Sequence, residues 1–290
     1  MSKVSLALAR LRSYRVGPSV WDELPVTRRA GVLVLLYSNK HNELASVLTL
    51  RSANLSSFSG HAALPGGKAD FESETPYAVA RRETCEEIGL PFSNLDLENR
   101  GYSIEHLTTL PSYLSRNLLA VRPVVAFIKP IEGVDHHHDS IKDLPSIINL
   151  DTHQSDEVCD VFSVPLHRFL SNAPGWYTSK PVNWGGLAWN MHWYRAIRLS
   201  KPVGQIGWYS VWGLTANILL DTAAIAFDTV PPMPHRRKGL VGDEVLLEGL
   251  REHGLLTEER DREKDNSLVF SDVFGIDSPL LKERYAQEES

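Results

Sequence analysis

The sequence predicts an α/β fold in which a mixed β-sheet lies between helical layers. Short apolar runs typical of strands stand on both sides of a predicted helix at residues 76–88. A second apolar stretch with nearly helical spacing, residues 213–227, follows late in the chain and predicts a buried helix. Strands and helices that succeed one another in this way are typical of layered α/β domains.

The first predicted element is a short helix at residues 2–14, with basic residues among its apolar ones. Its apolar positions are Val4, Leu6, Leu8 and Leu11. Because no acidic residue precedes Asp22, the segment also has the composition of a mitochondrial targeting sequence. A helix packed against the domain is the favoured alternative.

Apolar runs at residues 30–37 and 44–50 predict two strands, and the polar stretch between them predicts the turn of a hairpin. Further strand-like runs follow at residues 118–128 and 158–164, the second before a predicted helix start at 166–170. Apolar side chains then alternate as in a half-buried strand, at Leu187, Trp189, Met191 and Trp193.

The helix at residues 76–88 carries signals at both ends. Thr75 is a suitable N-cap, and Pro76 fits the first helical position because its missing N–H has no partner to lose there. Gly89 is the expected stop. A mostly apolar stripe at helical spacing provides the packing face, at Tyr77, Ala80, Thr84 and Ile88.

Three carboxylates, Glu83, Glu86 and Glu87, lie within about one turn of this helix. Side chains of like charge repel at this spacing unless a cation lies between them. Magnesium binds oxygen ligands and commonly joins a few carboxylates to substrate phosphates. The pattern therefore predicts a site where metal ions meet a phosphate group, with Arg82 holding one carboxylate. A solvated acidic helix face, balanced by Arg81 and Arg82, is the less favoured explanation.

The segment from Gly67 to Leu90 resembles the Nudix box. That pattern is Gly, five residues, Glu, seven residues, then Arg-Glu-U-x-Glu-Glu-x-Gly-U, where U is apolar. Glu74 and residues 82–90 fit the spacing. Two departures are a sixth residue between Gly67 and Glu74, and Thr84 where the pattern prefers an apolar residue. Neither departure removes a predicted ligand.

Residues 47–52 and 60–67 are similar to an additional motif of the coenzyme A diphosphatase subfamily of Nudix hydrolases. The matches fall at Leu48, Thr49, Arg51, Ser52, Gly60, Pro65, Gly66 and Gly67. Ser56 stands in place of the subfamily's second arginine and Leu64 in place of its phenylalanine. The resemblance covers residues 25–230.

The resemblance implies a Nudix-type α/β/α sandwich and a hydrolase dependent on Mg²⁺ or Mn²⁺. It implies cleavage of the diphosphate linkage of coenzyme A or its acyl derivatives, giving 3′,5′-ADP and 4′-phosphopantetheine or the acyl form. The alternatives are hydrolysis of oxidised nucleoside triphosphates such as 8-oxo-dGTP, and a non-catalytic nucleotide-binding module. Such modules usually lose box carboxylates, and this chain keeps them.

Site residues follow from the same resemblance. Metal ligands are expected at Glu83, Glu86, Glu87 and Gly67, and substrate contacts at Arg51, Ser52, Gly60, Gly66 and Lys68. Arg51 is the predicted phosphate clamp because its planar guanidinium suits bidentate contact, the alternative being an ordinary surface arginine. Arg82 completes the catalytic set, with Glu83 or Glu157 as general base.

Composition restricts the partners. The net charge of −6 provides no basic field for nucleic acid, and no apolar run approaches the ~20 residues of a membrane span. The chain has only two cysteines, Cys85 and Cys159, so a framework of disulfide bonds cannot be what mainly stabilises the fold. We expect a small-molecule partner, without nucleic acid or membrane, and leave a homodimer open.

We predict an N-terminal helical segment at residues 1–24, a catalytic domain at 25–230, and a partly charged and exposed C-terminal extension at 231–290. The resemblance implies a peroxisomal location, whereas the ending Glu-Glu-Ser is not a Ser-Lys-Leu-type signal. Mitochondrion and cytoplasm are the alternatives.

Two further features have competing explanations. The run Asp-His-His-His-Asp at residues 135–139 has transition-metal ligands, but a solvated loop is favoured. Tryptophans that would provide a platform for an adenine occur at Trp176, Trp184, Trp189 and Trp193. Alternating strand residues in a core are the favoured explanation for them.

Overall fold

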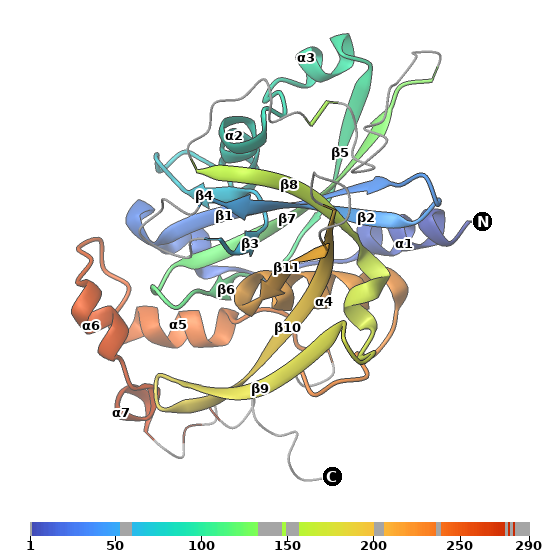
Figure 1. The fold of residues 1–290 in the computed structure, drawn as a ribbon. Coiled ribbons are helices and arrows are strands. Elements are labelled where there is room, and N and C mark those ends of the chain that lie inside the picture. Colours follow the sequence, from blue (N-terminus) through green and yellow to red (C-terminus); the bar gives the residue numbers. More distant parts are fainter. Residues whose placement is uncertain are drawn as a thin grey trace.

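The computed structural model describes residues 2–52, 60–132, 147–148, 157–199, 206–235, 239–275, 278 and 281. The histidine-rich run at 135–139 and the C-terminal signal position lie outside these residues. Helices cover both faces of a central sheet, and a smaller sheet lies beside it (Figure 1). The predicted α/β/α sandwich is confirmed.

Among the described residues, eight strands form the central sheet, in the order β3-β2-β1-β7-β5 with β4 on β1, β6 on β7 and β8 on β2. Their bounds are β1 Arg29–Ser38, β2 Leu44–Arg51, β3 Ala62–Ala63, β4 Gly66–Lys68, β5 Tyr102–Thr109, β6 Tyr113–Leu114, β7 Ala120–Pro130 and β8 Val158–Pro165. β1 and β7 run parallel and the other pairs antiparallel, so the sheet is mixed, as predicted.

Side chains of β1 alternate between two buried layers because successive residues of a strand point to opposite faces. Leu33 and Leu35 pack with α2 (Pro76–Ile88) and α3 (Asn94–Asn99). Val34 and Leu36 pack with α1 (Lys3–Ser13) and α4 (Gly213–Phe227). Burial on both faces explains why β1 reads as a continuous apolar run rather than an alternating one.

Helix α2 begins and ends where the sequence predicts. The Thr75 side chain accepts a hydrogen bond from the Ala78 N–H, and Gly89 closes the helix in the left-handed conformation at φ 70°. Ala80, Thr84 and Ile88 are buried against the sheet. Glu83 and Glu87 of the same helix lie against β4, at Gly67 and Gly66 respectively.

Helix α1 packs against α4 through Val4, Leu8 and Leu11. Leu6, an apolar residue of the same helix, is 43% exposed. It stands two residues from both Val4 and Leu8, and thus on the opposite side of a helix with 3.6 residues per turn. Arg12 joins α1 to β5 by two hydrogen bonds to Glu105, of 2.6 and 2.7 Å.

The smaller sheet has the order β11-β10-β9, with bounds β9 Tyr177–Trp184, β10 Leu187–Leu199 and β11 Ile206–Trp212. The predicted strand at residues 187–193 is confirmed as part of β10, whereas its two partners were not predicted. Helix α4 starts at Gly213, directly after β11. The segment at 166–170, expected to start a helix, is a 3₁₀ helix.

The remaining described helices are α5 Glu244–Glu252, α6 Arg262–Ser267 and α7 Phe270–Phe274, with 3₁₀ turns at Val20–Glu23 and Val26–Arg28. Most described residues of the charged run 258–265 are exposed, as expected, but Asp265 is buried. Its carboxylate lies 2.8 Å from a guanidinium nitrogen of Arg28, whose side chain is 2% exposed. The domain boundaries at residues 24 and 230 stay a prediction.

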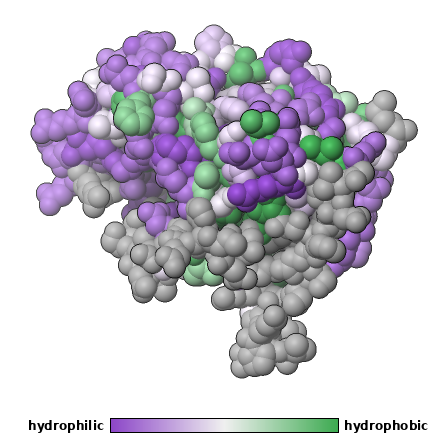
Figure 2. Space-filling view, turned by 90° about the horizontal axis from the view of Figure 1, so that it is seen from above, coloured by the Kyte–Doolittle hydropathy of each residue, from purple (hydrophilic) through white to green (hydrophobic). Residues whose placement is uncertain are grey.

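The outer surface carries scattered apolar residues. On the face in Figure 2, the described residues are mainly hydrophilic, with small groups of hydrophobic ones between them. Exposed large hydrophobic side chains include Phe71, Phe92 and Leu95. Within the described residues, no helix is both long and apolar enough to cross a membrane.

Candidate active site

Strand β4 brings two glycines against the glutamates of α2. Gly66 has φ +148°, and a Cβ atom there would overlap the backbone of Gly31 and Val32 on β1. A Cβ atom at Gly67 would overlap the carboxylate of Glu83. Only glycine therefore allows the strand to approach both β1 and α2 this closely.

Glu87 is the most buried of the three glutamates among the predicted metal ligands, at 5% exposure. Burial raises the pKa of its carboxyl to about 8, and the charges of Glu83 and Glu157 act in the same direction. The Gly66 N–H, which donates to Glu87 at 3.1 Å, and the charge of Arg51 act to lower this pKa. Burial and the neighbouring carboxylates thus disfavour a negative charge on Glu87 unless a cation compensates it.

Arg82 organises the rest of the cluster. It donates to Glu74 at 2.9 Å, to Glu83 at 3.0 Å and to the Lys68 carbonyl at 2.8 Å. Its contact with Glu86, at 3.4 Å, is the longest of its hydrogen bonds to carboxylates. Although burial lowers the pKa of Arg82, the hydrogen bonds that it donates to Glu74 and Glu83 raise this pKa above its ordinary value. The guanidinium therefore fixes α2 to the loop after β4.

Glu74 has a positioning role that the sequence analysis did not assign. Burial raises the pKa of its carboxyl, but hydrogen bonds from Arg82 and the N–H groups of Asp70 and Phe71 outweigh burial and lower it overall. A charged Glu74 thus ties the loop to Arg82. The fixed spacing between Glu74 and Arg82 in the box was the signal available in the sequence.

The end of β2 and the start of β8 also lie at this site. The Ser52 N–H donates to the Glu157 carbonyl at 2.7 Å, and the Gly60 N–H donates to the Arg51 carbonyl at 3.1 Å. Arg51 and Glu157 both act electrostatically on Glu87. These four predicted residues therefore lie together on one side of the glutamate cluster, while Lys68 is exposed at the far end of β4.

No three carboxylate, histidine or cysteine side chains of the described residues converge closely enough to hold a metal ion. The donors nevertheless suit a hard cation. Burial raises the pKa of Glu83, and the charge of Glu86 raises it further, while Arg82 opposes both. Glu86 is 58% exposed, and its carboxylate lies 3.4 Å from a guanidinium nitrogen of Arg82. A divalent ion would relieve the repulsion that Glu83 and Glu87 exert on each other.

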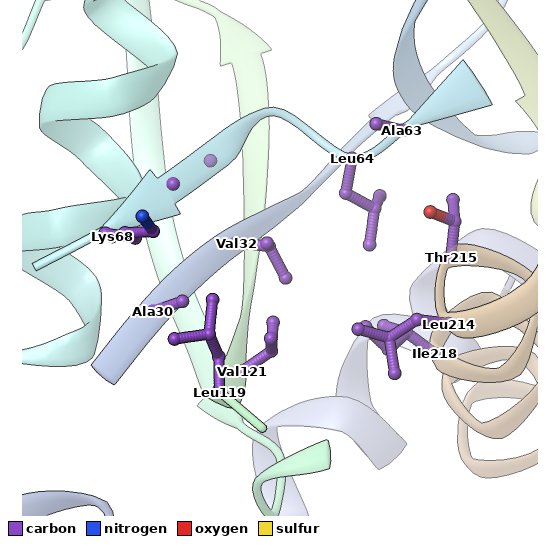
Figure 3. A pocket seen from close by; sticks show the side chains of 12 residues that line it. Ala30, Val32, Ala63, Leu64, Lys68, Leu119, Val121, Leu214, Thr215 and Ile218 are labelled. Atoms are coloured by element: carbon purple, nitrogen blue, oxygen red, sulfur yellow. The ribbon is translucent and has the colours of Figure 1, made fainter. Parts of the chain in front are cut away.

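Two adjoining cavities open beside this cluster. The smaller, of about 200 Å³, lies between the loop of β4, with Gly67 and Lys68, and the first turns of α4, with Leu214 and Thr215 (Figure 3). The larger, of about 540 Å³, extends from Arg51 to a group of tryptophans on the smaller sheet. The two cavities share a wall of Ala63, Leu214 and Thr215. Together they provide room for a substrate longer than a nucleotide.

The N-terminus of α4 faces both cavities. Its N-cap is Trp212, which provides no side-chain hydrogen bond to the first-turn N–H groups. Uncapped N–H groups and the positive end of a helix dipole favour an anion nearby. The sequence predicted the helix but not its position, because that position depends on the unpredicted strands of the smaller sheet.

Comparisons with known proteins identify the family of this chain. A family model described as "NUDIX domain" matches residues 27–182. The chain is 32% identical to "Peroxisomal coenzyme A diphosphatase 1, peroxisomal" of Saccharomyces cerevisiae, over 88% of this chain and 86% of the relative. It is 29% identical to the mouse "Peroxisomal coenzyme A diphosphatase NUDT7", over 78% of this chain and 80% of the relative.

A plant relative and a solved structure extend the comparison. "Nudix hydrolase 15, mitochondrial" of Arabidopsis thaliana is 31% identical over 70% of this chain, which spans 60% of that protein's length. The crystal structure of a NUDIX hydrolase from Alicyclobacillus acidocaldarius is 15% identical, with a TM-score of 0.34 over 71% of this chain and 98% of that chain.

Proposed function

Because the chain belongs to the Nudix hydrolase family, we propose that it hydrolyses the diphosphate linkage of coenzyme A or its acyl derivatives. The products are 3′,5′-ADP and 4′-phosphopantetheine, or the acylated form of the latter. The names of the yeast and mouse relatives support this substrate. The subfamily motif supports it as well, since Arg51, Ser52 and Gly60 lie beside the glutamate cluster.

The catalytic part of the proposal rests on one observation: two desolvated glutamates, Glu83 and Glu87, lie beside the two glycines of β4. Glu83, Glu86, Glu87 and the Gly67 carbonyl would hold the Mg²⁺ or Mn²⁺. A bound divalent ion neutralises phosphate oxygens and lowers the pKa of a bound water. Positioning and electrostatics provide most of the acceleration of phosphate transfer, so the site needs no covalent nucleophile.

The other residues have distinct roles in this proposal. Arg51 binds the diphosphate, to which its fork of N–H donors is matched. The backbone of Gly66 and Gly67 allows close approach of the phosphate. Of the two candidate bases, Glu157 is better suited than Glu83, because Glu83 is a proposed metal ligand and a metal-bound carboxylate is a weak base. Lys68, at the end of β4, and Ser52, directly after β2, provide further contacts to the substrate.

Replacing Gly67 by alanine is expected to lower kcat/KM for coenzyme A about 100-fold, because the new methyl group displaces the Glu83 carboxylate. The fold should persist, since Gly67 is not in the left-handed region. Gly17→Ala is the matched control, because a Cβ atom there meets nothing within 4 Å. Equal activity of the two variants would show that Glu83 does not need its present position.

A substrate series with Mg²⁺ or Mn²⁺ tests the proposal directly. We expect kcat/KM for coenzyme A and acyl-coenzyme A to exceed that for NADH, ADP-ribose and 8-oxo-dGTP, with products identified by mass. EDTA should abolish turnover. A wide preference for 8-oxo-dGTP would replace the proposal by nucleotide-pool sanitation. Binding of these compounds without any turnover would indicate a non-catalytic module.

A further inference from the structure

The larger cavity has aromatic walls that belong to the smaller sheet. Trp184 and Trp189 lie on either side of the β9–β10 turn, with ring centroids 4.7 Å apart and an interplanar angle of 47°. Trp193 and Trp212 are nearly parallel, with an interplanar angle of 13° and centroids 6.0 Å apart. All four line the cavity. We call this space the tryptophan chamber; flat aromatic walls of this kind bind planar rings by stacking.

The lining of the tryptophan chamber includes basic side chains. Arg51, Arg116 and Lys180 line it, and the Lys180 amine lies 5.1 Å from the ring centroid of Trp193. The structure records no ion pair between Arg116 or Lys180 and any described carboxylate. The carboxylate in the lining, Asp243, accepts a hydrogen bond from the Leu114 N–H instead. The chamber is therefore matched to an anionic group attached to a flat ring.

An unused acceptor lies in the same lining. Oδ1 of Asn217, on the second turn of α4, is buried and has no hydrogen-bond partner among the described residues. A buried acceptor left without a donor costs stability, so a ligand that supplies an N–H is favoured there. Asparagine side chains pair well with the exocyclic amine and N7 of adenine.

We propose that the tryptophan chamber binds the 3′-phosphoadenosine end of the substrate. The purine stacks on the tryptophans, Asn217 accepts from the exocyclic amine, and Lys180 with Arg116 binds the 3′-phosphate. The 5′-diphosphate then extends past the shared wall of Ala63, Leu214 and Thr215 into the smaller cavity, which Gly66 and Gly67 line. This inference rests on the proposed function and adds the residues that recognise the nucleotide.

An acyl-pantetheine arm is the competing occupant. It would explain the apolar walls, but it would leave Arg116 and Lys180 without a counter-charge. The nucleotide accounts for the aromatic rings, the cations and the Asn217 oxygen together, and the observations therefore favour it.

The decisive comparison is between coenzyme A and dephospho-coenzyme A, which differ only in the 3′-phosphate. We expect the wild type to prefer coenzyme A. In the double variant Lys180→Gln/Arg116→Gln, the ratio of the two kcat/KM values should fall about 10- to 100-fold, the loss expected for hydrogen bonds to a charged group. Lys3→Gln, at an exposed lysine on α1, is the control and should keep the wild-type ratio. An unchanged ratio in the double variant would overturn the inference.

A binding measurement separates this inference from the proposed function. Adenosine 3′,5′-bisphosphate should quench the tryptophan fluorescence of the Glu87→Gln variant and bind at least tenfold more tightly than 5′-AMP, with the difference lost in Lys180→Gln/Arg116→Gln. That result supports the chamber even if the wild type fails to hydrolyse coenzyme A. If hydrolysis occurs but Trp189→Leu alters only the dependence on acyl length, the chamber holds the acyl arm and the inference fails.

Discussion

Replacing Glu87 by glutamine is expected to lower kcat for coenzyme A about 1000-fold, which corresponds to about 4 kcal/mol of barrier. Glutamine keeps the size of the side chain and an oxygen that accepts from the Gly66 N–H. It removes the negative charge that a divalent ion requires. Steady-state kinetics and Mn²⁺ binding by calorimetry should therefore change together.

The fold of Glu87→Gln should be retained without metal. Because burial raises the pKa of Glu87 to about 8, the wild type loses stability by burying this charge at higher pH. The neutral amide avoids that cost, so the thermal midpoint at pH 8 should equal or exceed that of the wild type. Glu98→Gln, at an exposed glutamate of α3, is the control. Wild-type activity in Glu87→Gln would mean that α2 does not bind the catalytic metal.

Replacing Asp265 by alanine is expected to lower the free energy of unfolding by about 3–5 kcal/mol, because it leaves the buried guanidinium of Arg28 without its carboxylate. The guanidinium also donates to the carbonyls of Thr257 and Glu259, so the pair fastens the C-terminal helices to the start of β1. Urea denaturation followed by circular dichroism measures the change.

Two further variants make this result interpretable. Lys264→Ala breaks an exposed ion pair with Asp261, on a lysine whose side chain is 86% exposed, and should leave stability unchanged. The double variant Arg28→Met/Asp265→Leu replaces the buried pair by apolar side chains and should recover most of the loss. If Asp265→Ala alone were as stable as the wild type, the ion pair would not hold the C-terminal helices.

Local signals explain why much of the fold could be predicted. Thr75, Pro76 and Gly89 define α2 through the backbone conformations that they favour, and these act within a few residues. The hairpin of β1 and β2 is equally local. Leu6 shows the limit of such patterns, since it is one of the apolar residues of the predicted N-terminal helix and is nevertheless exposed.

Long-range pairing explains what was missed. The glutamates, Gly67 and Arg82 were found because one continuous motif contains them. The tryptophan chamber joins residues of β9, β10, β11 and α4 to Arg116, and neither β9 nor β11 has a sequence pattern that predicts its register. Asp265 was assigned to an exposed run because its partner, Arg28, lies 237 residues away in the chain.

The hairpin of β9 and β10, which carries Trp184 and Trp189, packs against the C-terminal part of the chain. The Phe270 N–H donates to the Gly185 carbonyl at 2.8 Å, and the Phe270 ring packs edge-on against Trp184. The region matched by the family model ends at residue 182, before the turn and its support. The position of Trp184 in the wall of the tryptophan chamber therefore depends on Phe270, which lies in a part of the chain that the family model does not match.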